Sequence, residues 1–199
     1  MIVEATAKLM RSDPQTPVTM ARVAEFVDAT PMAIYRYVSD REDLLGAVRD
    51  HVLGQLSHDI PPDAGWQEQL RAWMTSLYEH LVQYPECATR LKAGDALVGS
   101  WMHSTAILVE ILQSAGLSGL ELVESVHWIT FSTMGRVVLD IGASGPSGPG
   151  GFKAGLEQAS PEDVKVLRAL NRHVDRVWRN GFSYMIDRTI EGLETTLAR

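Results

Sequence analysis

The sequence predicts an all-α protein, with an N-terminal three-helix helix-turn-helix domain followed by a larger helical domain for ligand binding and dimerisation. Apolar residues recur at intervals of three and four along nearly all of its 199 residues, and few runs alternate as β-strands do. Hydrophobic residues make up 45% of the chain and charged residues 22%, a composition that buries a core and is not typical of disorder.

The first half of the chain divides into short helices at recognisable start signals. Thr19 and Thr30 are typical N-caps, and Pro31 fits the first helical position because its missing N–H would have no partner there. Ser39 and Glu42 have the spacing of a capping box. The predicted helices span about 2–10, 19–27, 30–37 and 39–56, and a domain boundary after residue 50 separates segments 1–50 and 51–199.

The second half continues with longer helices. They are predicted at about 66–83, 85–92, 95–114, 118–141 and 160–197. The run 142–151 is dominated by Gly, Ser and Pro, so a flexible loop is expected at about 142–159. The last helical pattern has two candidate breaks, near 171–173 and at Gly181.

A helix, a three-residue turn and a short helix at 19–37 match the geometry of a DNA-reading helix-turn-helix. Ala24 is small where the two helices approach each other, and Ile34 supplies an apolar contact between them. A purely structural αα-hairpin has the same requirements, so this pattern leaves both interpretations open.

The segment from Val18 to Leu45, VTMARVAEFVDATPMAIYRYVSDREDLL, resembles the N-terminal domain of the TetR family of transcriptional regulators. The run 34–45 is especially similar to the family's recognition helix and the start of its fourth helix. The close resemblance covers about residues 1–50, and the remainder fits only by pattern. It implies a sequence-specific DNA-binding regulator, a repressor that a small hydrophobic or aromatic effector releases from a palindromic operator.

The resemblance also implies which residues meet DNA. Met32 and Ala33 would offer apolar contacts to base edges, and Arg41 stands where the family often has a phosphate-binding lysine. The simpler reading is that the threonines only cap helices and that Tyr35 is packed. The implied contact set is Thr19, Arg22, Thr30, Pro31, Met32, Ala33, Tyr35, Arg36, Tyr37 and Arg41.

Two departures from the family pattern bear on affinity. Asp28 stands in the turn where glycine is usual, and Asp tolerates the left-handed backbone better than most residues. The chain also begins inside the first helix, without the basic arm that often precedes it. Net charge is −7, and segment 1–50 holds six Lys and Arg against eight Asp and Glu. We therefore expect modest DNA binding with a shallow salt dependence.

A palindromic operator requires a homodimer with two reading helices one DNA turn apart. The late helices carry apolar stripes at helical spacing, and the resemblance implies that they pair with their mates as a four-helix bundle. The alternative is an intramolecular core. The predicted interface residues are Val126, Thr130, Val137, Val177, Phe182, Met185, Ile186, Ile190 and Leu193.

Aromatic and methionine side chains gather on three of the predicted helices, a composition that suits a pocket for a planar or apolar molecule. The alternative is an ordinary hydrophobic core with solvent-exposed histidines. The predicted pocket residues are Trp66, Trp73, Tyr78, Trp101, Met102, His103, His127, Trp128, Phe131 and Met134.

Catalytic and metal-binding patterns are missing from the sequence. No two histidines stand four residues apart, Cys87 is the single cysteine, and neither a phosphate-binding loop nor a Gly-x-Ser-x-Gly elbow occurs. We expect no enzyme activity, cofactor or metal. No signal peptide or membrane span is seen, so a cytoplasmic protein without membrane partners is expected. The remaining alternative is a helical ligand-binding or protein-interaction module with weak or lost DNA binding.

Overall fold

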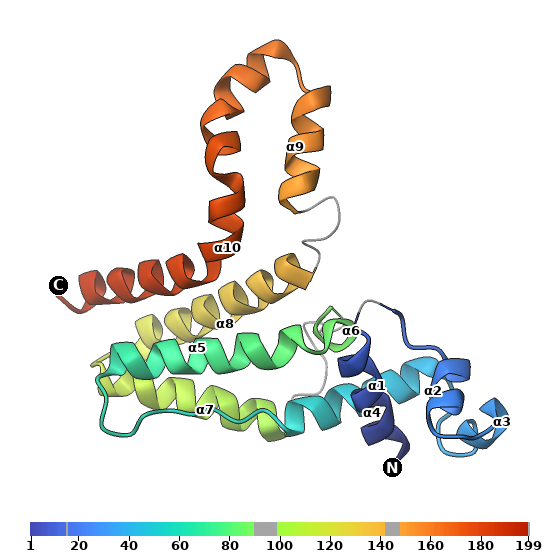
Figure 1. The fold of residues 1–199 in the computed structure, drawn as a ribbon. Coiled ribbons are helices and arrows are strands. Elements are labelled where there is room, and N and C mark those ends of the chain that lie inside the picture. The colour runs from blue at the N-terminus through green and yellow to red at the C-terminus, as the bar shows by residue number, and fades with distance from the viewer. Residues whose placement is uncertain (15, 90–98, 142–147, 199) are drawn as a thin grey trace. The chain divides into compact units, whose positions relative to one another are not determined.

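The structure is a computed structural model that describes residues 1–14, 16–89, 99–141 and 148–198 (Figure 1). Every regular element within those ranges is a helix, which confirms the all-α prediction. The chain divides into two compact units, Met1–Ser114 and Ala115–Arg199. The predicted boundary after residue 50 lies inside the first unit and stays a prediction of where the DNA-binding segment ends.

The first unit contains the predicted helix-turn-helix. Its helices are α1 (Ile2–Ser12), α2 (Met20–Phe26), α3 (Pro31–Ile34), α4 (Arg41–Gly54), α5 (Trp66–Val82), α6 (Pro85–Ala88) and α7 (Gly99–Ser114). Helix α1 packs on α2 and α4, α2 packs on α3, and α5 packs on α7. The predicted helices at 85–92 and 95–114 extend partly into 90–98, which lies outside the described residues.

One buried core joins the helix-turn-helix to later helices. Val23, Ala24 and Ile34 are each at most 1% exposed, as expected for residues where α2 and α3 approach each other. The same cluster includes Val48 from α4 and Cys87 from α6. The orientation of α2 and α3 is therefore set partly by side chains more than fifty residues downstream.

The predicted capping box at Ser39 and Glu42 is wrong by one residue. Asp40 is the N-cap of α4, and its Oδ1 accepts a hydrogen bond of 2.8 Å from the Asp43 backbone N–H. In return, Asp43 Oδ2 accepts from the Ser39 backbone N–H at 2.8 Å. Two short aspartate side chains thus form the reciprocal arrangement, whereas the Glu42 carboxylate bonds the Arg41 guanidinium.

The second unit consists of α8 (Gly119–Ile141), α9 (Pro149–Gln158) and α10 (Pro161–Leu197). The flexible loop predicted at 142–159 is wrong for the part that forms α9, while 142–147 lies outside the described residues. Pro149 occupies the first turn, where proline is tolerated. Phe152 and Leu156 share one face and are half-buried, and α9 packs on α10. Packing therefore outweighs the low helix propensity of the glycines.

Helix α10 continues through both predicted breaks, although Figure 1 shows it bending between the part beside α9 and its C-terminal part. Gly181 lies against the Arg136 guanidinium of α8. Arg136 Nη2 donates to the Trp178 carbonyl oxygen at 2.8 Å, and its Nε donates to Asp140 Oδ2 at 2.7 Å. A Cβ at position 181 would lie 2.2 Å from Arg136 Nη1. Gly181 thus provides the space for this guanidinium.

Gly181→Ala should destabilise the chain, because the new methyl group displaces the guanidinium from Trp178 and Asp140. We expect the free energy of unfolding to fall by about 1–3 kcal/mol. Gly192→Ala is the matched control: its Cβ meets no atom within 4 Å, so the unfolding free energy should rise by about 0.5–1 kcal/mol. Urea unfolding at one fixed protein concentration measures both, and equal effects would contradict the assignment.

Candidate nucleic-acid interface

The turn between α2 and α3 is built by local backbone chemistry. The Thr19 hydroxyl accepts from the Arg22 backbone N–H at 3.2 Å, and the Thr30 hydroxyl accepts from the Ala33 backbone N–H at 3.3 Å. Both predicted N-caps are thereby confirmed. Asp28 has a φ of +51°, in the left-handed region that the turn demands. The Ala29 N–H then bonds the Ala24 carbonyl oxygen at 2.8 Å and closes the turn.

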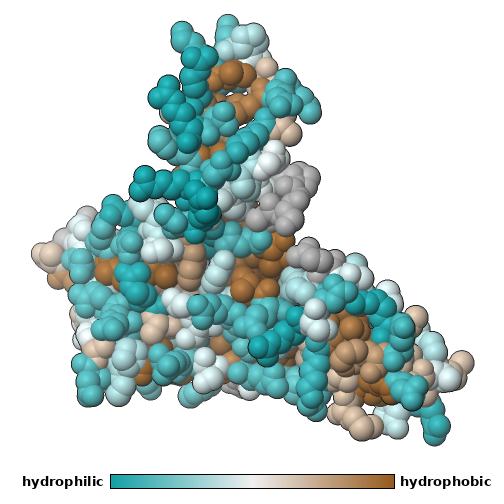
Figure 2. All heavy atoms as spheres, viewed as in Figure 1, coloured by the Kyte–Doolittle hydropathy of each residue, from teal (hydrophilic) through white to brown (hydrophobic). Residues whose placement is uncertain are grey.

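Helix α3 buries one side chain and exposes most of the others. Ile34 is 1% exposed, whereas Met32 is 74% and Tyr37 is 72% exposed. Tyr35 and Arg36 are also exposed, and Ala33 is half-buried. In Figure 2, hydrophobic residues interrupt the hydrophilic surface at the end of the first unit that carries α2 and α3. An exposed methionine and two exposed tyrosines on one four-residue helix and its C-terminal turn are not explained by packing within the first unit.

Arg22 bonds within the chain. Its Nη1 donates to the Thr16 and Pro17 carbonyl oxygens at 2.7 and 2.8 Å, and its Nη2 pairs with Asp13 Oδ2 at 2.7 Å. The guanidinium therefore fixes the segment that leads into α2. A phosphate contact by Arg22 would have to compete with these three bonds.

Arg41 also bonds within the chain. Its Nε donates to the Val18 carbonyl oxygen at 2.7 Å, and its Nη2 forms an ion pair with Glu86 of α6. Glu86 Oε2 accepts in turn from the Val18 backbone N–H at 2.9 Å. Sequence reasoning missed Glu86, because it lies 45 residues from Arg41 and no local pattern marks it.

The ten predicted contact residues thus fall into two groups. Six residues at the α3 end are exposed together: Thr30, Pro31, Met32, Tyr35, Arg36 and Tyr37. Thr19 is exposed but its hydroxyl caps α2, Ala33 is half-buried, and the two partly buried arginines hold the backbone. The contact set itself stays a prediction.

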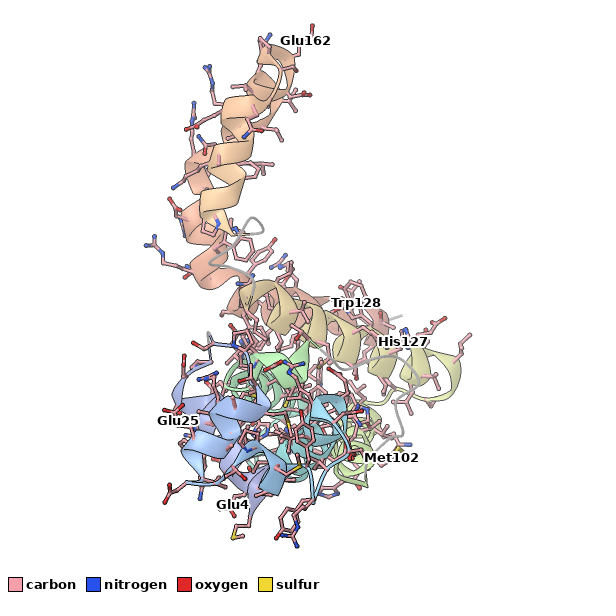
Figure 3. All side chains as sticks on the ribbon, turned by 90° about the vertical axis from the view of Figure 1, so that its right-hand side faces the viewer. Glu4, Glu25, Met102, His127, Trp128 and Glu162 are labelled. Atoms are coloured by element: carbon pink, nitrogen blue, oxygen red, sulfur yellow. The ribbon has the colours of Figure 1, made fainter. Side chains whose placement is uncertain are left out.

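The predicted pocket residues come from both units. In the first unit Trp73 is 1% exposed, Trp66, Tyr78 and Trp101 are half-buried, and Met102 and His103 are exposed. In the second unit His127, Trp128 and Phe131 are exposed on α8, and Met134 is half-buried; Figure 3 labels Met102, His127 and Trp128. A shared pocket stays a prediction.

A half-buried histidine outside the predicted set packs against the core of the first unit. The His58 ring stacks on Trp73 with centroids 5.3 Å apart, and its Nε2 is 2.7 Å from Ser104 Oγ. Trp73 Nε1 donates to the Ser104 carbonyl oxygen at 2.9 Å. His58 Nδ1 is buried without a hydrogen-bond partner, and burial lowers the pKa of the ring to about 4. The ring is therefore neutral at ordinary pH.

The predicted dimer residues differ in how far their own chain covers them. Val137, Ile186, Ile190 and Leu193 are buried, Val126, Thr130, Phe182 and Met185 are half-buried, and Val177 is 60% exposed. A different set of apolar side chains is exposed on α8: Leu120, Val123, Trp128, Phe131, Val138 and Leu139. The His127 ring lies 4.3 Å from that of Phe131. The dimer interface itself stays a prediction.

The described ranges lack two other features. No group of three His, Cys, Asp or Glu side chains there could hold a metal ion. None of the helices in those ranges is both long enough and apolar enough to cross a membrane.

Known regulators resemble this chain in sequence and fold. It matches no protein-family model. An HTH-type transcriptional regulator from Saccharopolyspora erythraea is 26% identical over 87 residues, which are 44% of this chain and 37% of that relative. The chain thus matches less than half of that regulator's length.

The fold is similar to that of a possible TetR family transcriptional regulator from Streptomyces coelicolor A3(2), with 21% identity, 98% of each chain covered and a TM-score of 0.79. The S. coelicolor TetR family protein ActR in complex with actinorhodin is 18% identical, with 100% of this chain and 97% of that chain covered and a TM-score of 0.70. BioQ with its double-stranded DNA operator is 21% identical, with 96% of this chain and 94% of that chain covered and a TM-score of 0.64. The chain therefore has the TetR-like fold.

The His58 ring should make stability depend on pH. The pKa of folded His58 is lowered from 6.5 to about 4, so between these values the unfolded chain binds a proton that the folded chain refuses. His58→Gln removes this titration and keeps a hydrogen-bonding group near Ser104. The unfolding free energy of the wild type minus that of His58→Gln should decrease as pH falls from 7 to about 4.5. Urea unfolding at each pH measures it, and a constant difference would disprove the assignment.

Proposed function

We propose that this chain is a TetR family transcriptional repressor that binds a palindromic operator as a homodimer and leaves it when a small hydrophobic or aromatic effector binds. The observation that carries the proposal is the exposed surface of α3, held on a single buried anchor, Ile34, in a chain with the TetR-like fold. The regulator from S. erythraea supports the same function.

The reading surface consists of Met32, Tyr35, Arg36 and Tyr37. Met32 is placed to contact thymine methyl groups, and the tyrosines and Arg36 suit phosphate and groove contacts. Arg22 and Arg41 hold backbone segments, so we assign them mainly to shaping the motif. Because Arg36 is the one Lys or Arg in residues 30–40, specific binding depends on fit more than on charge.

The effector is proposed from the aromatic composition around Trp66, Trp101 and Met102, and from the likeness to ActR, whose structure holds actinorhodin. Effector binding releases DNA only if the effector prefers a conformation that the operator does not. No catalytic role is proposed, since the similar proteins are regulators. We place the chain in the cytoplasm, where bacterial operators lie.

The homodimer interface is proposed on α8 and α10, where it would include the exposed α8 side chains Trp128 and Phe131 beside the predicted residues Val126 and Val177. The double change Trp128→Glu with Phe131→Glu should raise the dimer dissociation constant by about a hundredfold, because charges would be buried without partners. Sedimentation equilibrium measures it. Met32→Glu adds a charge on an exposed residue of α3 and should leave the dimer intact. A dimer unaffected by the α8 changes would exclude this face.

DNA binding is tested by selection from a random duplex pool at low salt, followed by affinity measurements at several KCl concentrations. We expect a palindrome to be enriched. Arg36→Gln should weaken its binding by about tenfold and lower the salt slope by about 1, because one phosphate contact is lost. Arg11→Gln changes an exposed arginine on α1 and is the matched control.

A wild-type chain that binds no sequence more tightly than random DNA would refute the repressor. That result would favour the alternative, a helical ligand-binding or protein-interaction module without operator binding.

A further inference from the structure

The Glu86 carboxylate bonds one residue on each side of the helix-turn-helix. Its Oε2 accepts from the Val18 backbone N–H at 2.9 Å, and its Oε1 forms an ion pair with Arg41 Nη2. Arg41 Nε donates to the Val18 carbonyl oxygen at 2.7 Å, so both backbone polar groups of Val18 are bonded. We call Val18, Arg41 and Glu86 the carboxylate clamp.

The carboxylate clamp joins three helix starts that are distant in sequence. Val18 directly precedes the N-cap of α2, Arg41 is the first residue of α4, and Glu86 lies in the first turn of α6. The Glu86 side chain is 17% exposed and the Arg41 side chain 31%. Partial burial limits competition from water, so the geometry is better defined than in an open surface pair.

The C-terminal end of α4 also contacts a later helix, α5. His80 Nε2 of α5 lies 2.7 Å from the Val52 carbonyl oxygen near the end of α4. Burial lowers the pKa of His80, which favours the neutral ring in this contact. Cys87 packs in the helix-turn-helix core, with its Sγ 3.6 Å from Met10 Sδ. A shift of α6 therefore acts directly on the starts of both α2 and α4.

We propose that Glu86 is a positioning residue for DNA binding: its carboxylate fixes the orientation of α2 and α3, and through it a displacement of α5 and α6 reaches the reading helix. The proposal rests on the proposed operator binding. It names the contact through which an effector would act, and it requires that Glu86 raise operator affinity although it is negatively charged.

An electrostatic role and a positioning role of Glu86 predict opposite changes of operator affinity when Glu86 is replaced by Gln. Glu86→Gln removes a negative charge beside Arg41, which keeps its bonds to Val18 and Glu42, so a purely electrostatic role predicts tighter DNA binding. A positioning role predicts weaker operator binding, by about tenfold, with binding to random DNA unchanged or slightly tighter. Glu79→Gln removes the same charge from an exposed position on α5 and is the matched control.

The experiment measures operator and random-duplex affinities of the full chain at several KCl concentrations. Weaker operator binding in Glu86→Gln alone supports the proposal, and equal or tighter binding overturns it. In the double variant Arg41→Gln with Glu86→Gln, the loss of operator affinity should be smaller than the sum of the two single losses, because each single variant already breaks the same ion pair. Additive losses would count against the pair.

A second measurement needs no DNA, so it separates this proposal from operator binding itself. Hydrogen–deuterium exchange should be faster at the amides of 18–37 in Glu86→Gln than in Glu79→Gln, with α5 and α7 unchanged. Equal exchange in the two variants overturns the positioning role even if the operator is found. If exchange is faster in Glu86→Gln but no operator sequence is found, the positioning role of Glu86 is supported and the repressor assignment is refuted.

Discussion

The geometry of the helix-turn-helix depends on the burial of Ile34. A helix of four residues has no stability by itself, because helix nucleation is unfavourable and its few hydrogen bonds offset little of that cost. Helix α3 persists because Ile34 inserts into a core that also holds Val23, Val48 and Cys87. This core includes residues from α4 and α6, so the short helix α3 is positioned by the first unit's packing and not by its own sequence.

Electrostatics shapes the motif more than it attracts DNA. Arg22 holds the segment that precedes α2, and Arg41 connects the same segment to Glu86. Both guanidiniums are bonded to backbone carbonyl oxygens, where a planar group with several donors is well suited. The formal charge of the chain is −7, so a nonspecific electrostatic contribution to DNA binding is small. Shape complementarity must supply most of the proposed specificity.

Local chemistry explains what the sequence predicted well. The caps Thr19 and Thr30, the left-handed Asp28 and the close approach at Ala24 each depend on neighbours within a few residues. Features set by distant residues were not predictable in this way. The partner of Arg41 lies on α6, and α9 forms although its composition suggested a loop, because α10 covers one side of it. The apolar stripes could not reveal whether a partner or the same chain covers them.

A palindromic operator amplifies small errors of orientation. In a homodimer each protomer presents one reading helix, so a free-energy penalty at one motif is incurred at both half-sites. A protein with many phosphate contacts retains substantial affinity after such a loss, whereas Arg36 is the one Lys or Arg in residues 30–40. A small displacement of α6, transmitted by the Glu86 carboxylate to the starts of α2 and α4, would therefore be sufficient to release the proposed homodimer from its operator.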